Sequence, residues 1–122
     1  MLYSILIYGY EDLVSDWTVQ EENAVMARHS ALRERLTAEH KLGPAVRLMR
    51  TTTATTLRFT GEEVIIDGPF AETKEQLLGI YVVECATLDE AIKVARALSF
   101  ESAVLEIRPV SLFEPGGDLA EG

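Results

Sequence analysis

The sequence predicts an α+β protein of the ferredoxin-like type, with the element order βαββαβ and an extra β-hairpin. Two helix starts carry this prediction, because Thr18 with Glu21 and Thr87 with Glu90 each have the spacing of a capping box. Apolar, β-rich segments precede, separate and follow the two helices. The length of 122 residues suits a single domain with one ordinary core. We expect that domain over residues 1–113 and a flexible C-terminal tail over residues 114–122.

The first half of the chain predicts one strand and one long helix. The strand covers about Leu2–Tyr8 and gives way to a loop around Glu11 and Asp12. The helix begins at Thr18 and continues to about Lys41, where Gly43-Pro44 stops it. Its apolar stripe, at helical spacing, consists of Val25, His29, Leu32 and Leu36.

The second half predicts a hairpin, a long strand, a helix and a final strand. Two β-rich segments, Ala45–Met49 and Thr53–Phe59, lead to a turn at Gly61-Glu62 and a short strand over residues 64–66. A longer strand spans Leu77–Cys85, and the last strand spans about Val104–Val110. The helix between them begins after Thr87, and one of its faces is formed by Leu88, Ala91, Ala95 and Leu98.

The two long strands are apolar on both faces. Along residues 2–8 and 77–83, the side chains on both faces of each strand are predominantly apolar. A face in contact with water would instead carry mainly polar side chains. Two helices can cover only one face of the sheet, so the other face needs a different cover. We therefore expect a homodimer in which two sheets face each other.

The segment from Asp67 to Glu75 is the most distinctive in the chain. A strand ends at Asp67, and Gly68-Pro69 follows with backbone angles that hold a carboxylate in few positions. Such a mounting suits a reactive or binding group. The alternative is an ordinary tight turn, in which the Asp67 side chain bonds its own backbone.

This segment, Asp67-Gly68-Pro69-Phe70-Ala71-Glu72-Thr73-Lys74-Glu75, together with Gly79 to Val83, resembles the signature of the DGPF branch of the YCII-related (YciI-like) proteins. The two ends of the domain, residues 1–8 and 106–110, are similar to that family's ends as well. The resemblance implies a ferredoxin-like fold that forms a dimeric α+β barrel. It also implies an enzymatic role built on a His–Asp pair, for which His29 and Asp67 are the matching positions.

Composition excludes some partners. A formal net charge of −9 argues against nucleic acid, because phosphate binding needs clustered Lys and Arg. A small polar or anionic ligand in a local basic pocket stays compatible with it. The apolar first strand is too short for a signal or membrane helix, so we expect a cytoplasmic protein without membrane contact. No metal-spaced His and Cys cluster or phosphate-binding glycine loop occurs, and we expect no metal and no cofactor.

His29 is the main candidate for a catalytic residue, because an imidazole on a buried stripe needs a hydrogen-bond partner. A carboxylate such as Asp67 would orient the ring and raise its pKa towards that of a general acid or base. The alternatives are a core histidine satisfied by a backbone carbonyl and a ligand contact without catalysis. His40, at the helix end, suits a surface role.

The predicted substrate-binding residues are Arg47, Arg58, Phe70 and Tyr81. Arginines near the site would hold an anionic substrate, although surface solvation is the competing interpretation for each. Two function classes stay open. One is a small cofactor-independent enzyme with an isomerase, lyase or dehalogenase-like reaction. The other is a non-catalytic ligand-binding or regulatory accessory module.

Overall fold

The computed structural model describes residues 1–117 and 119, so positions 118 and 120–122 of the expected flexible tail lie outside the described residues. The elements follow in the order β1 (Leu2–Gly9), α1 (Glu11–Ser15), α2 (Val19–Ala38), β2 (Leu42–Arg47), the 3₁₀ turn η1 (Thr51–Thr53), β3 (Thr55–Thr60), β4 (Glu62–Asp67), β5 (Gln76–Glu84), α3 (Leu88–Leu98) and β6 (Val104–Pro109).

The main sheet has four antiparallel strands in the order β2-β5-β1-β6. β1 lies at its centre and pairs with β5 on one side and β6 on the other, so that Ile5 is opposite both Tyr81 and Ile107. With the β3–β4 hairpin set aside, the chain follows the βαββαβ order. The predicted ferredoxin-like α+β fold, including the extra hairpin, is therefore confirmed.

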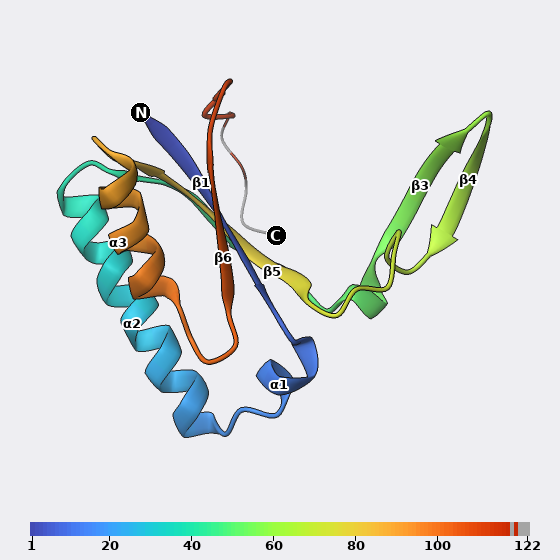
Figure 1. The fold of residues 1–122 in the computed structure, drawn as a ribbon, viewed down its shortest axis with the longest axis horizontal. Helices are drawn as coiled ribbons and strands as arrows, with labels where there is room; N and C mark the ends of the chain where they lie inside the picture. The colour runs from blue at the N-terminus through green and yellow to red at the C-terminus, as the bar shows by residue number, and fades with distance from the viewer. Residues whose placement is uncertain (118, 120–122) are drawn as a thin grey trace.

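Both long helices cover the same face of this sheet, where they lie side by side (Figure 1). α2 starts at the predicted capping box, in which Thr18 Oγ1 accepts from the Glu21 amide and Glu21 Oε1 accepts from the Thr18 amide, both at 3.1 Å. The core joins Ile5 and Val83 of the strands, and Cys85 directly after β5, to Leu36 and Leu98 of the helices. The predicted stripe of α2, including His29, is buried as expected.

Several element boundaries differ from the prediction. α1 replaces the expected loop at Glu11, and α2 ends at Ala38 because His40 takes a positive φ of 58°. Gly43 and Pro44 then lie inside β2 instead of stopping the helix. At α3 only half of the second capping box forms, since the Glu90 side chain accepts from the Ala86 amide.

The buried face of α3 differs from the prediction at two residues. Leu88 is 53% exposed, whereas Val94, which was not expected on that face, is buried with Ala91, Ala95 and Leu98. Leu88 is the first residue of the helix, directly after its N-cap Thr87.

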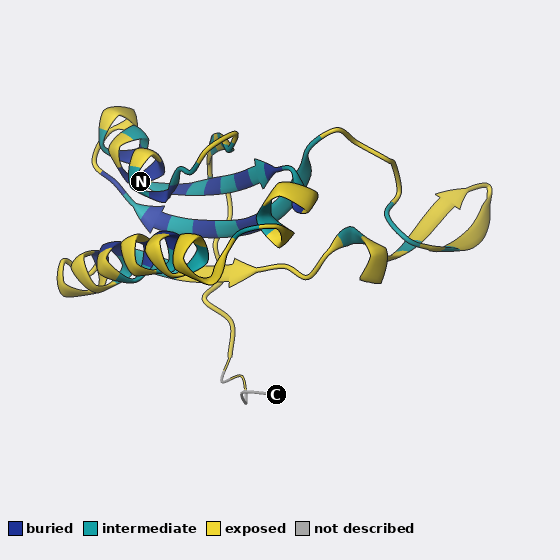
Figure 2. Cartoon of the chain, turned by 90° about the horizontal axis from the view of Figure 1, so that it is seen from below, coloured by how far each residue is buried: buried dark blue, intermediate teal, exposed yellow. Residues whose placement is uncertain are grey.

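The second face of the main sheet has no cover from the described residues of the same chain. On β1 the side chains alternate strictly between buried and half-buried (Figure 2), and the half-buried set includes Leu2, Leu6 and Tyr8. Leu6 pairs with Ile80, and Ile80 pairs with Val46, which is 50% exposed. We call this apolar surface the open face.

The β3–β4 hairpin, residues 55–67, projects away from the main sheet and is called the arm below (Figures 1 and 2). Its strands pair only with each other, from Thr55 opposite Asp67 to Thr60 opposite Glu62. One side of the arm presents Leu57, Phe59 and Ile65, which are 50%, 73% and 69% exposed. A two-stranded hairpin of this kind has little stability of its own.

Candidate functional site

A cavity of about 370 Å³ lies between the N-terminal half of α2 and the sheet. Its walls come from the end of β1, from α1, from α2, from the segment 45–50 and from β5. Its polar lining consists of Glu11, Ser15, Glu22, His29, Arg33, Arg47, Arg50 and Tyr81. Trp17 and Phe100, which meet edge to face with ring centroids 5.2 Å apart, form part of its apolar lining. The volume is of the size that suits a small-molecule ligand.

His29 lies in the wall of this cavity with its side chain held by α3. Its Nε2 is 3.0 Å from the carbonyl oxygen of Leu98. A carbonyl only accepts, so Nε2 carries the proton and Nδ1 of the neutral ring carries the lone pair. Nδ1 makes no hydrogen bond with any described residue. Among these residues, every fully buried side-chain N or O atom has a hydrogen-bond partner, so Nδ1 is not fully buried. His29 is also one of the residues that line the cavity.

The electrostatic surroundings favour the neutral form of His29. Burial lowers its pKa below the ordinary value of 6.5, the hydrogen bond to Leu98 partly opposes this, and the nearby Arg28, Arg33 and Arg47 lower it further. This direction is opposite to the increase expected from a neighbouring carboxylate. At neutral pH the ring is consequently a proton acceptor.

Tyr81 connects His29 to an arginine on the same helix. The Tyr81 ring meets the His29 ring edge to face, with centroids 6.2 Å apart and an interplanar angle of 89°. Its hydroxyl oxygen accepts a hydrogen bond of 2.7 Å from Nη1 of Arg33. Arg33 follows His29 by one helical turn, which places both side chains on the same side of α2.

The other two arginines of the cavity are paired with carboxylates. Arg47 donates to Glu22 at 2.9 Å and also lies 3.7 Å from the sulfur of Met26. Arg50 donates to Asp12 at 2.7 Å, to the Glu11 carbonyl at 3.1 Å and to Ser15. These pairs join the segment 47–50 to α1 and α2 at the mouth of the cavity.

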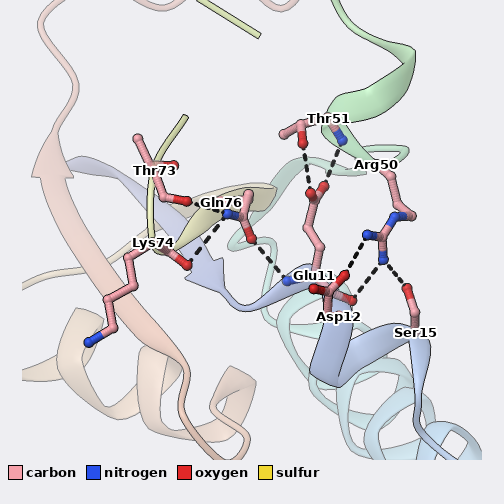
Figure 3. Close-up of polar contacts among 8 residues, drawn as sticks. All are labelled: Glu11, Asp12, Ser15, Arg50, Thr51, Thr73, Lys74 and Gln76. Atoms are coloured by element: carbon pink, nitrogen blue, oxygen red, sulfur yellow. Dashed lines mark hydrogen bonds and ion pairs between the residues drawn. The ribbon is translucent and has the colours of Figure 1, made fainter. Parts of the chain in front are cut away.

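Glu11 is a buried carboxylate that holds the chain around the cavity together (Figure 3). Its two carboxylate oxygens accept from the amide and the hydroxyl of Thr51, each at 2.7 Å. Its own amide donates to Gln76 Oε1 at 3.0 Å, and Gln76 Nε2 donates to the carbonyl of Thr73 at 2.6 Å. The end of the 67–75 segment is thus fixed to α1 at the edge of the cavity.

The predicted site residues separate into two groups. His29, Arg47 and Tyr81 line the cavity together. Asp67 is exposed at the base of the arm, and Arg58 and Phe70 lie on and beside the arm, joined by a 3.3 Å bond from Arg58 to the Phe70 carbonyl. None of these three residues lines the cavity. Within one chain the expected His29–Asp67 hydrogen bond is therefore not made, and His29 Nε2 bonds to the Leu98 carbonyl instead.

The predicted geometry of the Gly-Pro turn after Asp67 is confirmed. Gly68 has a φ of +118°, which disfavours any side chain. Its amide donates to the Ala54 carbonyl at 2.7 Å, and its carbonyl accepts from Thr56 at 2.8 Å. These bonds close the base of the arm.

The cavity residues that sequence reasoning missed include Glu11, Trp17, Arg33 and Phe100. Arg33 carried a usable signal, because it lies one turn beyond His29 on the same helix. Glu11, Trp17 and Phe100 carried none, since only the folded chain brings α1, the loop before α2 and the loop after α3 together.

Among residues 1–117 and 119, no helix is long and apolar enough to cross a membrane. The same residues contain no group of three or more His, Cys, Asp or Glu side chains placed to hold a metal ion. Cys85 is a free, buried thiol, and burial raises its pKa.

Comparison with known proteins identifies the family of this chain. The family model of the YCII-related domain matches residues 1–114. An uncharacterised protein of Rhizobium meliloti (strain 1021) is 48% identical over 120 residues, which cover 95% of this chain and 97% of that protein. The chain therefore belongs to the YCII-related family.

Proposed function

We propose that this protein is a small cofactor-independent enzyme in which His29 moves a proton on a small molecule bound in the cavity. The observation that carries the proposal is a cavity-lining imidazole whose Nε2 is held by the Leu98 carbonyl, while Nδ1 has no hydrogen-bond partner in the described part of the chain. A ring fixed at one nitrogen and open at the other has the orientation that a general base needs.

The chemical step we propose is proton abstraction. The substrate C–H or O–H proton passes to Nδ1, its electron pair stays on the substrate, and the imidazolium returns the proton at another atom or to a leaving group. Such a step fits the isomerase, lyase or dehalogenase-like reactions that the sequence favours. The edge of Tyr81 and the carbonyl of Leu98 keep the ring in place during both transfers.

A homodimer formed through the open face is part of the proposal. Leu6, Ile80 and Val46 form a continuous apolar row across that face, and a second copy would remove it from water. Asp67 can act on His29 only in this setting, as a nearby negative charge, because Leu98 holds Nε2 and Nδ1 takes the substrate proton. Since it lies at the base of the arm, it would have to approach His29 of a second copy, as would Arg58 and Phe70.

The remaining predictions concern the limits of the chain and its surroundings. A single domain over 1–113, membership of the DGPF branch, a cytoplasmic location and the absence of a nucleic-acid partner stay predictions. The 67–75 segment supports membership of the DGPF branch, the short apolar strand at residues 2–8 supports the cytoplasmic location, and the net charge of −9 supports the absence of a nucleic-acid partner.

A non-catalytic ligand-binding module is the second candidate. The observation that favours it is that Arg47 and Arg50 are already paired, while the described cavity holds one histidine and no nucleophilic thiol. Such a module would bind the same ligands without exchanging their protons.

Hydrogen–deuterium exchange of bound compounds separates the two candidates. A panel of small carbon acids is incubated with the protein in D₂O, and deuterium incorporation is followed by NMR. We expect exchange that His29→Gln lowers by about 10²–10⁴-fold, while His40→Gln, at an exposed position just after α2, retains it. Compounds that bind without any enzyme-dependent exchange would support the module instead.

A further inference from the structure

Arg33 differs from every other arginine of the cavity, because in the described part of the chain it has no carboxylate partner. Arg47 is neutralised by Glu22 and Arg50 by Asp12. Arg33 donates one N–H group to the Tyr81 hydroxyl, which leaves the other N–H groups of its guanidinium for a ligand. A half-buried cation in a cavity wall without a counter-charge has a strong preference for an anion.

The groups around Arg33 indicate how such an anion would lie. Tyr81 accepts from Arg33, so its O–H hydrogen points away and can be donated to a ligand. His29, one turn before Arg33, lines the same cavity, and its Nε2 is already held by the Leu98 carbonyl. The rings of Trp17 and Phe100 supply an apolar surface in the cavity lining.

The charge balance selects the class of anion. One cation without a carboxylate partner matches one negative charge, and the Glu11 carboxylate in the same lining disfavours a dianion such as a phosphate ester. The planar fork of arginine binds a carboxylate through two parallel hydrogen bonds. The volume of about 370 Å³ leaves room for an apolar group beside that carboxylate.

We propose that the substrate is a small organic monocarboxylate with an apolar or aromatic group, anchored at its carboxylate by Arg33 and the Tyr81 hydroxyl. The inference rests on the proposed function, and adds to it the identity of the anchor and the class of ligand. The anchored carboxylate would hold the adjoining carbon near His29 Nδ1.

Binding of a matched pair of probes tests the anchor. Phenylacetate and phenylacetamide have nearly the same shape, and only the first carries a charge. By isothermal titration we expect the wild-type protein to bind phenylacetate about tenfold or more tightly than the amide. Arg33→Gln should abolish this preference and Arg33→Lys should restore part of it. Arg35→Gln, which removes the same charge from the same helix, should keep it, because Arg35 pairs with Glu39 outside the cavity.

The imidazole NMR signals of His29 distinguish failure of the anchor from failure of the proposed function. If both probes shift these signals but the carboxylate has no advantage, the anchor is wrong and the His29 site stands. If Arg33→Gln keeps the preference while remaining folded, the anchor is equally wrong. If neither probe binds at millimolar concentration or shifts the His29 signals, the carboxylate proposal and its His29 site both fall.

Discussion

At the scale of single residues, the most consequential feature is the neutral state of His29. Its pKa in the folded protein is lowered by burial, whereas in the unfolded chain it is about 6.5. Below that pH the unfolded state binds more protons than the native state, so stability should fall as the pH is lowered from 7.5 to 5.5. Urea denaturation at both values should show this loss.

The loss should become smaller in His29→Gln and persist in His40→Gln, because His40 is exposed. The pH range from 7.5 to 5.5 lies above the range in which the Glu90 carboxyl titrates, because hydrogen bonds from Lys41 and Ala86 lower the pKa of Glu90 below 4.5. An equal pH dependence in the wild type and in His29→Gln would contradict the assignment to His29.

The predicted His29–Asp67 pair also belongs to this scale. In one chain Asp67 lies outside the cavity, so any effect on His29 has to come from a second copy. We expect Asp67→Asn to lower the pKa of His29 in the assembled protein and to leave it unchanged after dilution to the monomer. NMR titration of the ring at two protein concentrations measures it. The same pKa for Asp67→Asn and the wild type in the assembled state would remove the pair.

At the scale of elements, Glu11 fixes α1 to the segment before the arm. Glu11→Ala would leave the partly buried Thr51 amide without an acceptor, at a cost of about 1–3 kcal/mol in the free energy of unfolding. Thr51→Val removes only the hydroxyl bond and should cost about 1 kcal/mol. Urea denaturation of the two variants measures the difference. Equal costs would mean that the amide bond contributes nothing beyond the hydroxyl bond.

The base of the arm should respond to Gly68→Ala. The φ of +118° is unfavourable for alanine, although no neighbouring atom would touch the new methyl group. We expect faster amide hydrogen exchange across the β3–β4 pairs, with little change in the melting temperature, because the arm contributes little to the core. Gly117→Ala, where φ is not positive and nothing lies nearby, serves as the control. Global unfolding of Gly68→Ala would identify the turn as a folding device.

Some helix boundaries could be predicted from the sequence, and others could not. The start of α2 was predictable because its capping box is local, and the burial of His29 followed from helical spacing. α1 was missed because it has five residues and its N-cap, Tyr10, makes no side-chain cap bond. The end of α2 depends on the positive φ of His40, a conformation that histidine adopts only occasionally and that no neighbouring residue signals.

The cavity was predictable only in part for the same reason. His29, Arg47 and Tyr81 were identified one by one from their types and positions. The contact from Arg33 to Tyr81 spans 48 positions in the sequence, and that from His29 to Leu98 spans 69. Only the packing of α2 against β5 and α3 decides such partners.

At the scale of the whole molecule, the open face should determine assembly. Leu6 and Ile80 are adjacent on it, and we expect a homodimer that buries about 1,600 Å² or more in total. Light scattering at micromolar concentration should report twice the chain mass of 13.5 kDa. Leu6→Glu should shift the protein to the monomer, whereas Val19→Glu, at the exposed start of α2, should not. A wild-type protein that stays monomeric would leave the open face unexplained.

The closed base of the arm makes residues 55–67 an exchangeable cassette. The Gly68 amide bonded to the Ala54 carbonyl brings the two ends of the cassette together, and its strands form no ladder with the main sheet. Hairpins of other lengths and sequences could therefore be grafted between Ala54 and Gly68 without altering the order β2-β5-β1-β6. Diversification within this architecture has a natural place here, since the graft point is separate from the core that holds His29.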